Sequence, residues 1–311
     1  MSPMICLHPV RSAGLFALSV LAVAAVPARA ETKPFELNMD RVKIVDPKGL
    51  AAPTYFVPTV KLLVTAQGSV WSQGKSMGAN AQAHGKYYVQ GLEKDLLQDL
   101  ARKLQDDLVA KLRATGATVL TYEDLKADPL VAGRGRESAD GKWGLPTTSK
   151  DGLTYVIASP SDEQAFESAI TGPLFWFRPM AKEKKIIALL PEITFTVPQM
   201  WGEKDVGYKR ASASIAVNPV MLLHGATIHV TNPQASFTSI SIQTHGQRHA
   251  AEVTGTVKKM SEDTTKFSSA WGRSSADYLF TLDPTAFSEG VLRVGTAINT
   301  MIADQVKKVR K

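Results

Sequence analysis

Histidines are the side chains of this sequence with the clearest capacity to bind a metal ion. His245 and His249 stand four residues apart, a spacing that brings two imidazoles to one face of a helix. Gly246 disfavours a helix here and stands where a zinc protease carries its catalytic glutamate. The sequence therefore predicts no metal site. It leaves one alternative, in which His224, His245 and His249 come together in space.

Nucleophilic catalysis is not indicated by the spacing of serines, histidines and aspartates, which does not assemble a triad. The only cysteine is Cys6, close to the N-terminus. The adjacent carboxylates Asp106-Asp107 and Glu262-Asp263 fall in polar stretches and are interpreted as solvated charge. We expect a protein without catalytic activity and without a cofactor. A metal-assisted or serine hydrolase is the remaining enzymatic alternative.

The densest aromatic cluster lies between Pro173 and Pro179. Core packing is one interpretation, for Phe175 and Phe177 in particular. An exposed or pocket position is the other, for Trp176 in particular, because aromatic rings on a surface are typical of ligand pockets and partner anchors. The candidate ligand- or partner-binding residues are Phe175, Trp176, Phe177, Arg178 and Trp201.

Residues 127–152 form a basic, glycine-rich stretch. Backbone N–H groups of Gly133-Arg-Gly-Arg136 could cradle an anion. The stretch lacks the ending of a nucleotide P-loop and the glycine spacing of a dinucleotide site. A surface loop is the main interpretation, and anion binding by Arg134 and Arg136 is the alternative.

The first thirty residues are typical of an export signal. Arg11 precedes an apolar run from Ala13 to Val26, and Ala28-Arg-Ala30 provides a cleavage site. The run is shorter than the roughly 20 residues that span a bilayer. We therefore predict cleavage after Ala30, localisation in the periplasm, and a mature chain with no cysteine and no transmembrane segment.

The formal net charge of +7 is modest for a chain of 311 residues. It fits an ordinary soluble surface, or loose attraction to anionic envelope polymers or lipid head groups. No nucleic-acid partner is predicted.

Two long helices are predicted to support these residues. Leucines recur every three or four residues from Leu92 to Leu112, which predicts an amphipathic helix over 92–114. Strands are expected on either side of it, over 60–66 and 117–122. Asp283 followed by Pro284 predicts the start of a second helix, over 284–307.

The rest of the chain is expected to supply an extended N-terminal arm and a set of strands. Residues 31–59 contain four prolines and predict the arm, and 74–85 predict a loop. Ser161 predicts a helix start. Strands are expected at 155–157, 186–190, 193–197, 211–230, 237–243 and 252–257, with Pro191 as an edge, bulge or break. The predicted fold class is α/β, a single domain over 60–311 with a mixed, largely antiparallel sheet packed by two long amphipathic helices.

This order of elements resembles the α/β domain of the curli-secretion (CsgG-like) and penicillin-binding-protein-activator lipoproteins. The resemblance rests on the strand Val60–Ala66, the helix Leu92–Ala114, and Ala117-Thr-Val-Leu-Thr-Tyr122 followed by Glu123-Asp124-Leu125. It extends to Ile215–Val220, to Ala226–Val230 with Thr231-Asn-Pro233, and to the C-terminal helix. The lipid-anchor cysteine of these proteins is missing, and the 127–152 loop is longer. The resemblance implies a non-enzymatic envelope protein that binds other proteins.

The expected function is therefore that of an exported periplasmic accessory or binding protein without catalytic activity, acting through contacts with an envelope protein. The alternative is a soluble carrier of an apolar or amphipathic small molecule. Self-association into a homo-oligomer is compatible with either function.

Overall fold

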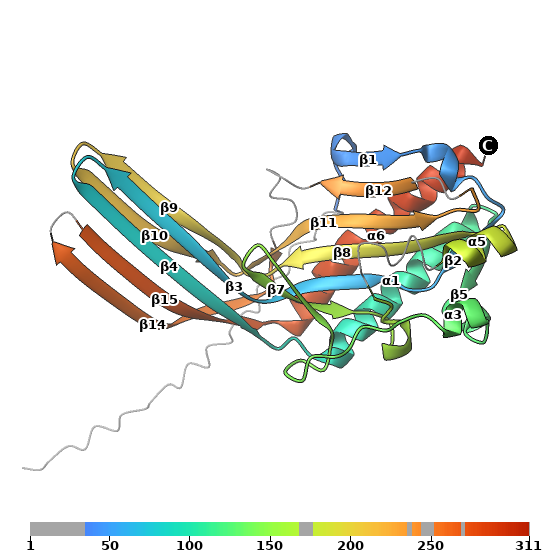
Figure 1. Cartoon of the computed structure of the whole chain (residues 1–311), viewed down its shortest axis with the longest axis horizontal. Coiled ribbons are helices and arrows are strands. Elements are labelled where there is room, and N and C mark those ends of the chain that lie inside the picture. The colour runs from blue at the N-terminus through green and yellow to red at the C-terminus, as the bar shows by residue number, and fades with distance from the viewer. Residues whose placement is uncertain (1–34, 168–176, 235–237, 244–251, 269–270, 311) are drawn as a thin grey trace, which may run out of the picture. The chain divides into compact units, whose positions relative to one another are not determined.

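A mixed β-sheet of 13 strands organises the fold (Figure 1). The computed structural model describes residues 35–167, 177–234, 238–243, 252–268 and 271–310. Along the main path of the sheet the strands are β1 (Val42–Val45), β12 (Thr238–Gln243), β11 (Val220–Thr231), β8 (Ile187–Thr196), β3 (Lys61–Ser76), β4 (Ala79–Gln90), β15 (Trp271–Leu282) and β14 (Gly255–Ser268). Three shorter strands pair with this path: β2 (Thr54–Val57) with β8, β7 (Leu153–Ala158) with β3, and β13 (Glu252–Val253) with β11. Two more extend it, since β5 (Thr118–Thr121) pairs with β2 and β6 (Thr147–Lys150) pairs with β7.

Most neighbouring strands of the sheet are antiparallel. The parallel pairs are β4 with β15, β3 with β8, and β2 with both β5 and β8. The predicted class, a mixed α/β structure with a largely antiparallel sheet, is confirmed in this coarse form.

Helices are more varied than the sequence predicts. The described α-helices are α1 (Lys94–Ala114), α2 (Tyr122–Leu125), α3 (Pro129–Ala132), α5 (Arg178–Lys184) and α6 (Pro284–Val309). Short 3₁₀ turns cover Met39–Arg41, Pro47–Leu50 and Asp162–Gln164. Strands make up most of the regular structure, so a description based on two long helices is too simple. Among the described helices none is both long and apolar enough to cross a membrane.

Helices α1 and α6 bury apolar faces in the main core. Five leucines of α1, at positions 97, 100, 104, 108 and 112, are at most 1% exposed. Helix α6 begins as its sequence predicts, because Asp283 accepts hydrogen bonds from the backbone N–H groups of Thr285 and Ala286. Burial of these faces against the sheet stabilises both helices far more than helix propensity alone.

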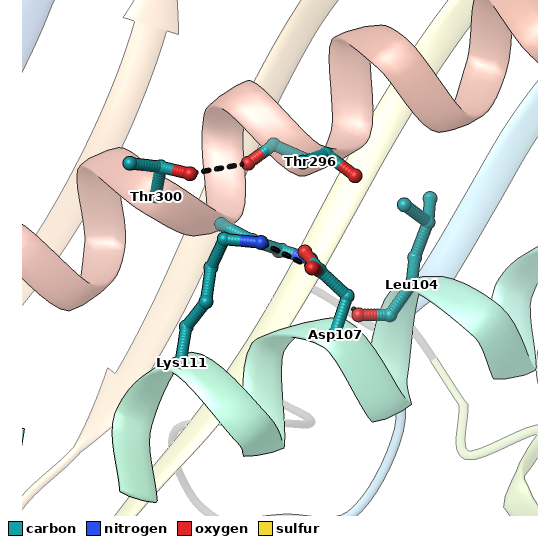
Figure 2. Close-up of polar contacts among 6 residues, drawn as sticks. Leu104, Asp107, Lys111, Thr296 and Thr300 are labelled. Carbon is teal, nitrogen blue, oxygen red and sulfur yellow. Dashed lines mark hydrogen bonds and ion pairs between the residues drawn. The ribbon is translucent and has the colours of Figure 1, made fainter. Parts of the chain in front are cut away.

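The contact between α1 and α6 combines close packing with buried polar bonds. A Cβ added at Gly295 would lie 2.5 Å from a methyl carbon of Leu104, so glycine permits this approach. Asn299 donates hydrogen bonds to the carbonyl oxygen of Leu104 and to a carboxylate oxygen of Asp107, both at 2.9 Å. Asp107 also pairs with Lys111 one turn further along α1, as Figure 2 shows. These bonds fix the register between the two helices.

A second layer of strands packs on the β3–β4 hairpin. Strands β9 (Gln199–Gly207) and β10 (Arg210–Asn218) form a separate two-stranded sheet. A Cβ at Gly74 would lie 2.5 Å from the carbonyl oxygen of Ser212, and the Ser72 hydroxyl donates to the carbonyl oxygen of Glu203 at 2.7 Å. The inner face of β3–β4 is therefore covered. Figure 1 shows β3–β4, β9–β10 and β14–β15 running beyond the ends of α1 and α6.

Several elements differ from their predictions for identifiable reasons. The predicted arm 31–59 contributes β1 and β2, which pair with β12, β5 and β8, so the compact unit starts at Phe35. The predicted loop 74–85 is wrong, because a turn at Met77-Gly78 joins β3 directly to β4, and Gly78 supplies the positive φ of +76°. The helix expected at Ser161 is only a 3₁₀ turn over Asp162–Gln164 within the described residues.

Pro191 does not break its strand, since β8 continues through it. On one side β8 pairs with β2 at Ile187 and Ala188, and then with β3 from Glu192 onward. Pro191 lies in the gap where β8 changes neighbours. The missing N–H of proline is tolerated at such a gap more easily than inside a continuous ladder.

The predicted export signal, residues 1–30, lies outside the described residues, as do Phe175, Trp176, His245 and His249.

Candidate functional site

Three large aromatic side chains are exposed on one face of the β3–β4–β15–β14 sheet, which we call the open face. Trp71 on β3 is 50% exposed, Tyr88 on β4 is 44% exposed and Trp271 on β15 is 53% exposed. Their strand neighbours on the opposite face, such as Ser72 and Tyr87, are buried. Because side chains alternate along a strand, the three rings belong to the same face.

The strand register places the three rings in a staggered line. Trp71 pairs with His84, which lies four residues before Tyr88. Trp271 pairs with Asn80, another four residues along β4. At about 3.3 Å per residue, successive rings are about 13 Å apart along the strands, and the line covers about 26 Å. This geometry suits a ligand that is extended along the strands.

Polar side chains fill the spaces between the rings. The Arg273 guanidinium lies 6.0 Å from the Trp71 ring centroid, and the His84 ring lies 6.2 Å from it. Gln73 donates to the side-chain oxygen of Asn80 at 3.0 Å, and Gln82 is paired with both Gln73 and Arg273 in the register. Amide and guanidinium groups therefore stand beside each exposed tryptophan.

Lys142 lies at the Tyr88 end of the line of rings. Its ammonium group lies 5.7 Å from the Tyr88 ring centroid and 4.3 Å from that of Trp143. It also lies 3.4 Å from the side-chain oxygen of Gln67, the residue paired with Tyr88. Lys142 belongs to the basic stretch 127–152, so part of that stretch borders the open face.

Cations outnumber carboxylates on the open face. Lys75, Lys86, Lys142, Lys258 and Arg273 lie on or beside it, according to the register and the contacts above. On the strands of this face the carboxylates are Asp263 and Asp277, and Asp277 accepts a hydrogen bond from Ser261 at 3.0 Å. Asp140 lies beside Lys142, whose backbone N–H donates to its carboxylate at 2.7 Å. The resulting local field attracts anions.

A second group of charges lies at the start of β3, around the buried Lys61. Lys61 is 5% exposed, and its ammonium group is 2.9 Å from a carboxylate oxygen of Glu137 and also donates to the carbonyl oxygen of Phe166. Glu192 stands directly across from Lys61 in the parallel β3–β8 pairing. Burial raises the pKa of Glu192, whereas the charge of Lys61 acts to lower it. Burial together with the charge of Lys61 lowers the pKa of the His229 imidazole.

The buried charges tie a crossing segment to the sheet. Glu137 and Phe166 belong to two stretches that bond to each other, through the Arg136–Phe166 bridge and the Glu137 N–H donating to the carbonyl oxygen of Ala165 at 2.8 Å. Lys61 holds both stretches on β3. We therefore interpret this group as structural.

Metal binding and serine catalysis find no support in the described part of the chain. No three histidine, cysteine or carboxylate side chains gather there into a metal site. Gly74-Lys-Ser-Met-Gly78 has the Gly-x-Ser-x-Gly spacing of a nucleophile elbow, which in a hydrolase forms a strand-to-helix turn. Here Gly74, Lys75 and Ser76 end strand β3, and Met77-Gly78 turns into the antiparallel strand β4, so these residues do not form an elbow.

The predicted aromatic site does not assemble as one surface among the described residues. Phe177 is fully buried, and its ring packs edge to face on Phe56 and Phe166. Arg178 is exposed at the first position of α5. Trp201 lies on β9, where its indole N–H donates to a carboxylate oxygen of Glu203 at 3.1 Å.

The two arginines predicted to bind an anion make hydrogen bonds to backbone carbonyl groups of the protein instead. Arg134 donates to the carbonyl oxygen of Leu130 at 2.6 Å. Arg136 donates to the carbonyl oxygens of Arg134 and Glu163, and its guanidinium stacks 4.1 Å from the Phe166 ring centroid. His224 is exposed on β11, with its ring 6.5 Å from that of Tyr155.

The three aromatic residues of the open face are not predicted as a site from the sequence, although the sequence carries a signal for them. Polar and aromatic residues alternate with small or apolar ones from Trp71 to Lys75 and from Asn80 to Tyr88. Two such runs separated by Met77-Gly78 predict a hairpin with one wet face. The abundance of glycine and polar residues in 74–85 instead favours a loop.

Comparison with known proteins finds no matching family model, no matching curated protein and no matching solved structure.

Proposed function

We propose that this chain is an exported binding protein of the cell envelope without catalytic activity, and that the open face is its binding surface. The observation that carries the proposal is the exposure of Trp71, Tyr88 and Trp271 on one sheet face. Large exposed aromatic residues that are grouped on a surface are typical of interaction sites. Periplasmic localisation remains part of the proposal and rests on the signal-like N-terminus.

The alternative function, a carrier of apolar small molecules, has less support. Its predicted pocket wall includes Phe177, which is used in core packing, and Trp201, which lies on a different element. Carrier sites are concave and mostly apolar. The open face instead combines exposed rings with amides and cations.

Site-specific photo-crosslinking in intact cells tests the proposed function. A benzophenone amino acid replaces Trp71 or Trp271, and in a matched control it replaces Lys103, whose side chain is 57% exposed on α1. We expect crosslinked adducts from both tryptophan positions and none from position 103. The absence of adducts at both tryptophan positions, in a protein that is exported and folded, would refute the proposal.

A further inference from the structure

We propose that the ligand of the open face is a linear polysaccharide that carries acidic groups. This inference rests on the proposed function and names the chemical class of its ligand. It differs from the protein partner that the sequence predicts. Three properties of the open face support it: the arrangement of the rings, the polarity of the side chains between them, and the sign of the charge.

The rings suit a chain of sugars. The faces of sugar rings carry C–H groups, and the negative face of an aromatic ring attracts their partial positive charge. Trp71, Tyr88 and Trp271 present three such rings over about 26 Å of a nearly continuous sheet face. A single sugar could occupy only one ring, so the line of three favours an extended chain.

Side chains between the rings suit hydroxyl groups better than an apolar protein surface. Gln73, Asn80 and Gln82 present amides that both donate and accept hydrogen bonds. The centre of a typical protein–protein interface is depleted of charge and rich in apolar contacts. At the open-face positions of β3, β4 and β15, in the rows from Gln67 to Lys75, Leu279 is the one aliphatic side chain, so this part of the open face lacks such a centre.

Charge complementarity indicates an acidic ligand. Lys86 and Arg273 lie on strands β4 and β15 between the three rings, and Lys142 lies beside Tyr88. Asp277 is paired with Lys86 in the register, Asp140 lies beside Lys142, and Asp263 is on the outermost strand. Arg273 and Lys75 have no carboxylate opposite them in the register, so the balance within the line of rings stays positive. Carboxylates spaced along a polysaccharide would meet these cations while its sugar rings stack on the tryptophans.

Calorimetric titration of the full chain with defined polymers tests the inference. The probe is an oligomer of polygalacturonic acid, and its matched control is the same oligomer with every carboxylate methyl-esterified. We expect binding of the acidic oligomer that weakens with added salt, and at least about tenfold weaker binding of the esterified oligomer at low salt. Equal affinity for the two oligomers, or no binding of the acidic one, would overturn the inference.

Variants separate stacking from charge. Trp71→Ala combined with Trp271→Ala should weaken binding of the acidic oligomer at least about tenfold. Lys86→Gln combined with Arg273→Gln should weaken it and reduce its salt dependence. Lys103→Gln on α1 should change neither. If the tryptophan variants, shown to melt like the parent protein, bind with parental affinity, the inference is wrong.

Two further polymers test competing classes of ligand. Polyglutamate of equal charge should bind at least about tenfold more weakly than the acidic oligomer, because it has no sugar rings to stack. A single-stranded oligothymidylate should also bind more weakly. Tighter binding of either polymer would overturn the inference. Crosslinks from positions 71 and 271 to a protein, with no binding of the acidic oligomer, would overturn this inference and leave the proposed function standing.

Discussion

Replacing Lys61 by methionine should destabilise the protein strongly. The substitution keeps most of the apolar stem and removes the cation that pairs with Glu137 at 2.9 Å and stands across from Glu192. The Lys61 and Glu137 side chains are only 6% and 15% exposed, so water cannot replace the lost partner. Removing one partner of a buried ion pair typically costs about 3–5 kcal/mol, and we expect a loss in that range at neutral pH.

The free energy of unfolding lost in Lys61→Met should depend on pH, through Glu192, and on the carboxylate of Glu137. Since the charge of Lys61 acts to lower the pKa of Glu192, Lys61→Met should raise that pKa further. The destabilisation should therefore shrink as the pH falls and Glu192 takes up a proton. Adding Glu137→Gln to Lys61→Met should restore part of the stability, with a coupling free energy of about 0.5–3 kcal/mol.

Urea unfolding measures these free energies directly. Lys103→Met is the matched control, because its pair with Asp99 is 57% and 43% exposed, and we expect a change below about 1 kcal/mol. A Lys61→Met variant that loses no more than the Lys103→Met control would refute the structural role of the buried charges. So would a double variant that is no more stable than Lys61→Met alone.

Three further predictions concern the core, a helix cap and a half-buried histidine. Leu104→Ala should lower the free energy of unfolding by about 2–5 kcal/mol, because the side chain is fully buried against Gly295; a loss below about 1 kcal/mol in urea titrations would contradict this packing. Asp283→Ala should lower the free energy of unfolding by about 1 kcal/mol, seen as a lower melting temperature, because the N-cap is lost. Asp283→Asn should keep most of the parental stability, since asparagine also caps helices. Equal melting temperatures of all three proteins would contradict the cap. The pKa of His229 is lower in the folded protein than in the unfolded chain, so the unfolded chain binds more protons at acidic pH. The free energy of unfolding should therefore decrease as the pH falls below about 6.5. His229→Gln should remove that part of the pH dependence, and an unchanged slope in urea titrations from pH 7 to pH 5 would contradict it.

Local signals in the sequence predict the helices of the supporting layer well. The leucine spacing from Leu97 to Leu112 is a property of one continuous segment, and the structure buries that stripe. Asp283-Pro284 marks the start of α6 for an equally local reason, since a side chain caps the backbone beside it. Both features depend on residues within a few positions of one another.

The open face depends on contacts between distant segments, which the sequence does not reveal. Trp271 comes beside Asn80 only because β15 pairs with β4 in parallel, across almost 200 residues of sequence. Ser72 and Gly74 are covered by β9 and β10, and this makes the other face of the hairpin the exposed one. Without knowledge of these contacts, the polar, glycine-rich sequence of the hairpin resembles that of a loop.

Retention on isolated cell envelopes is the most direct measurement of the central claim, that the open face is the binding surface. Purified protein is mixed with washed envelopes, and the bound fraction is measured for the parent, for Trp71→Ala combined with Trp271→Ala, and for Tyr208→Ala. Tyr208 is the control because it is 78% exposed but lies at the β9–β10 turn, away from the open face. We expect the affinity to fall by about tenfold or more in the double variant, since an aromatic hot spot contributes roughly 2 kcal/mol, and to stay unchanged in Tyr208→Ala. Equal retention of the parent and the double variant would contradict it.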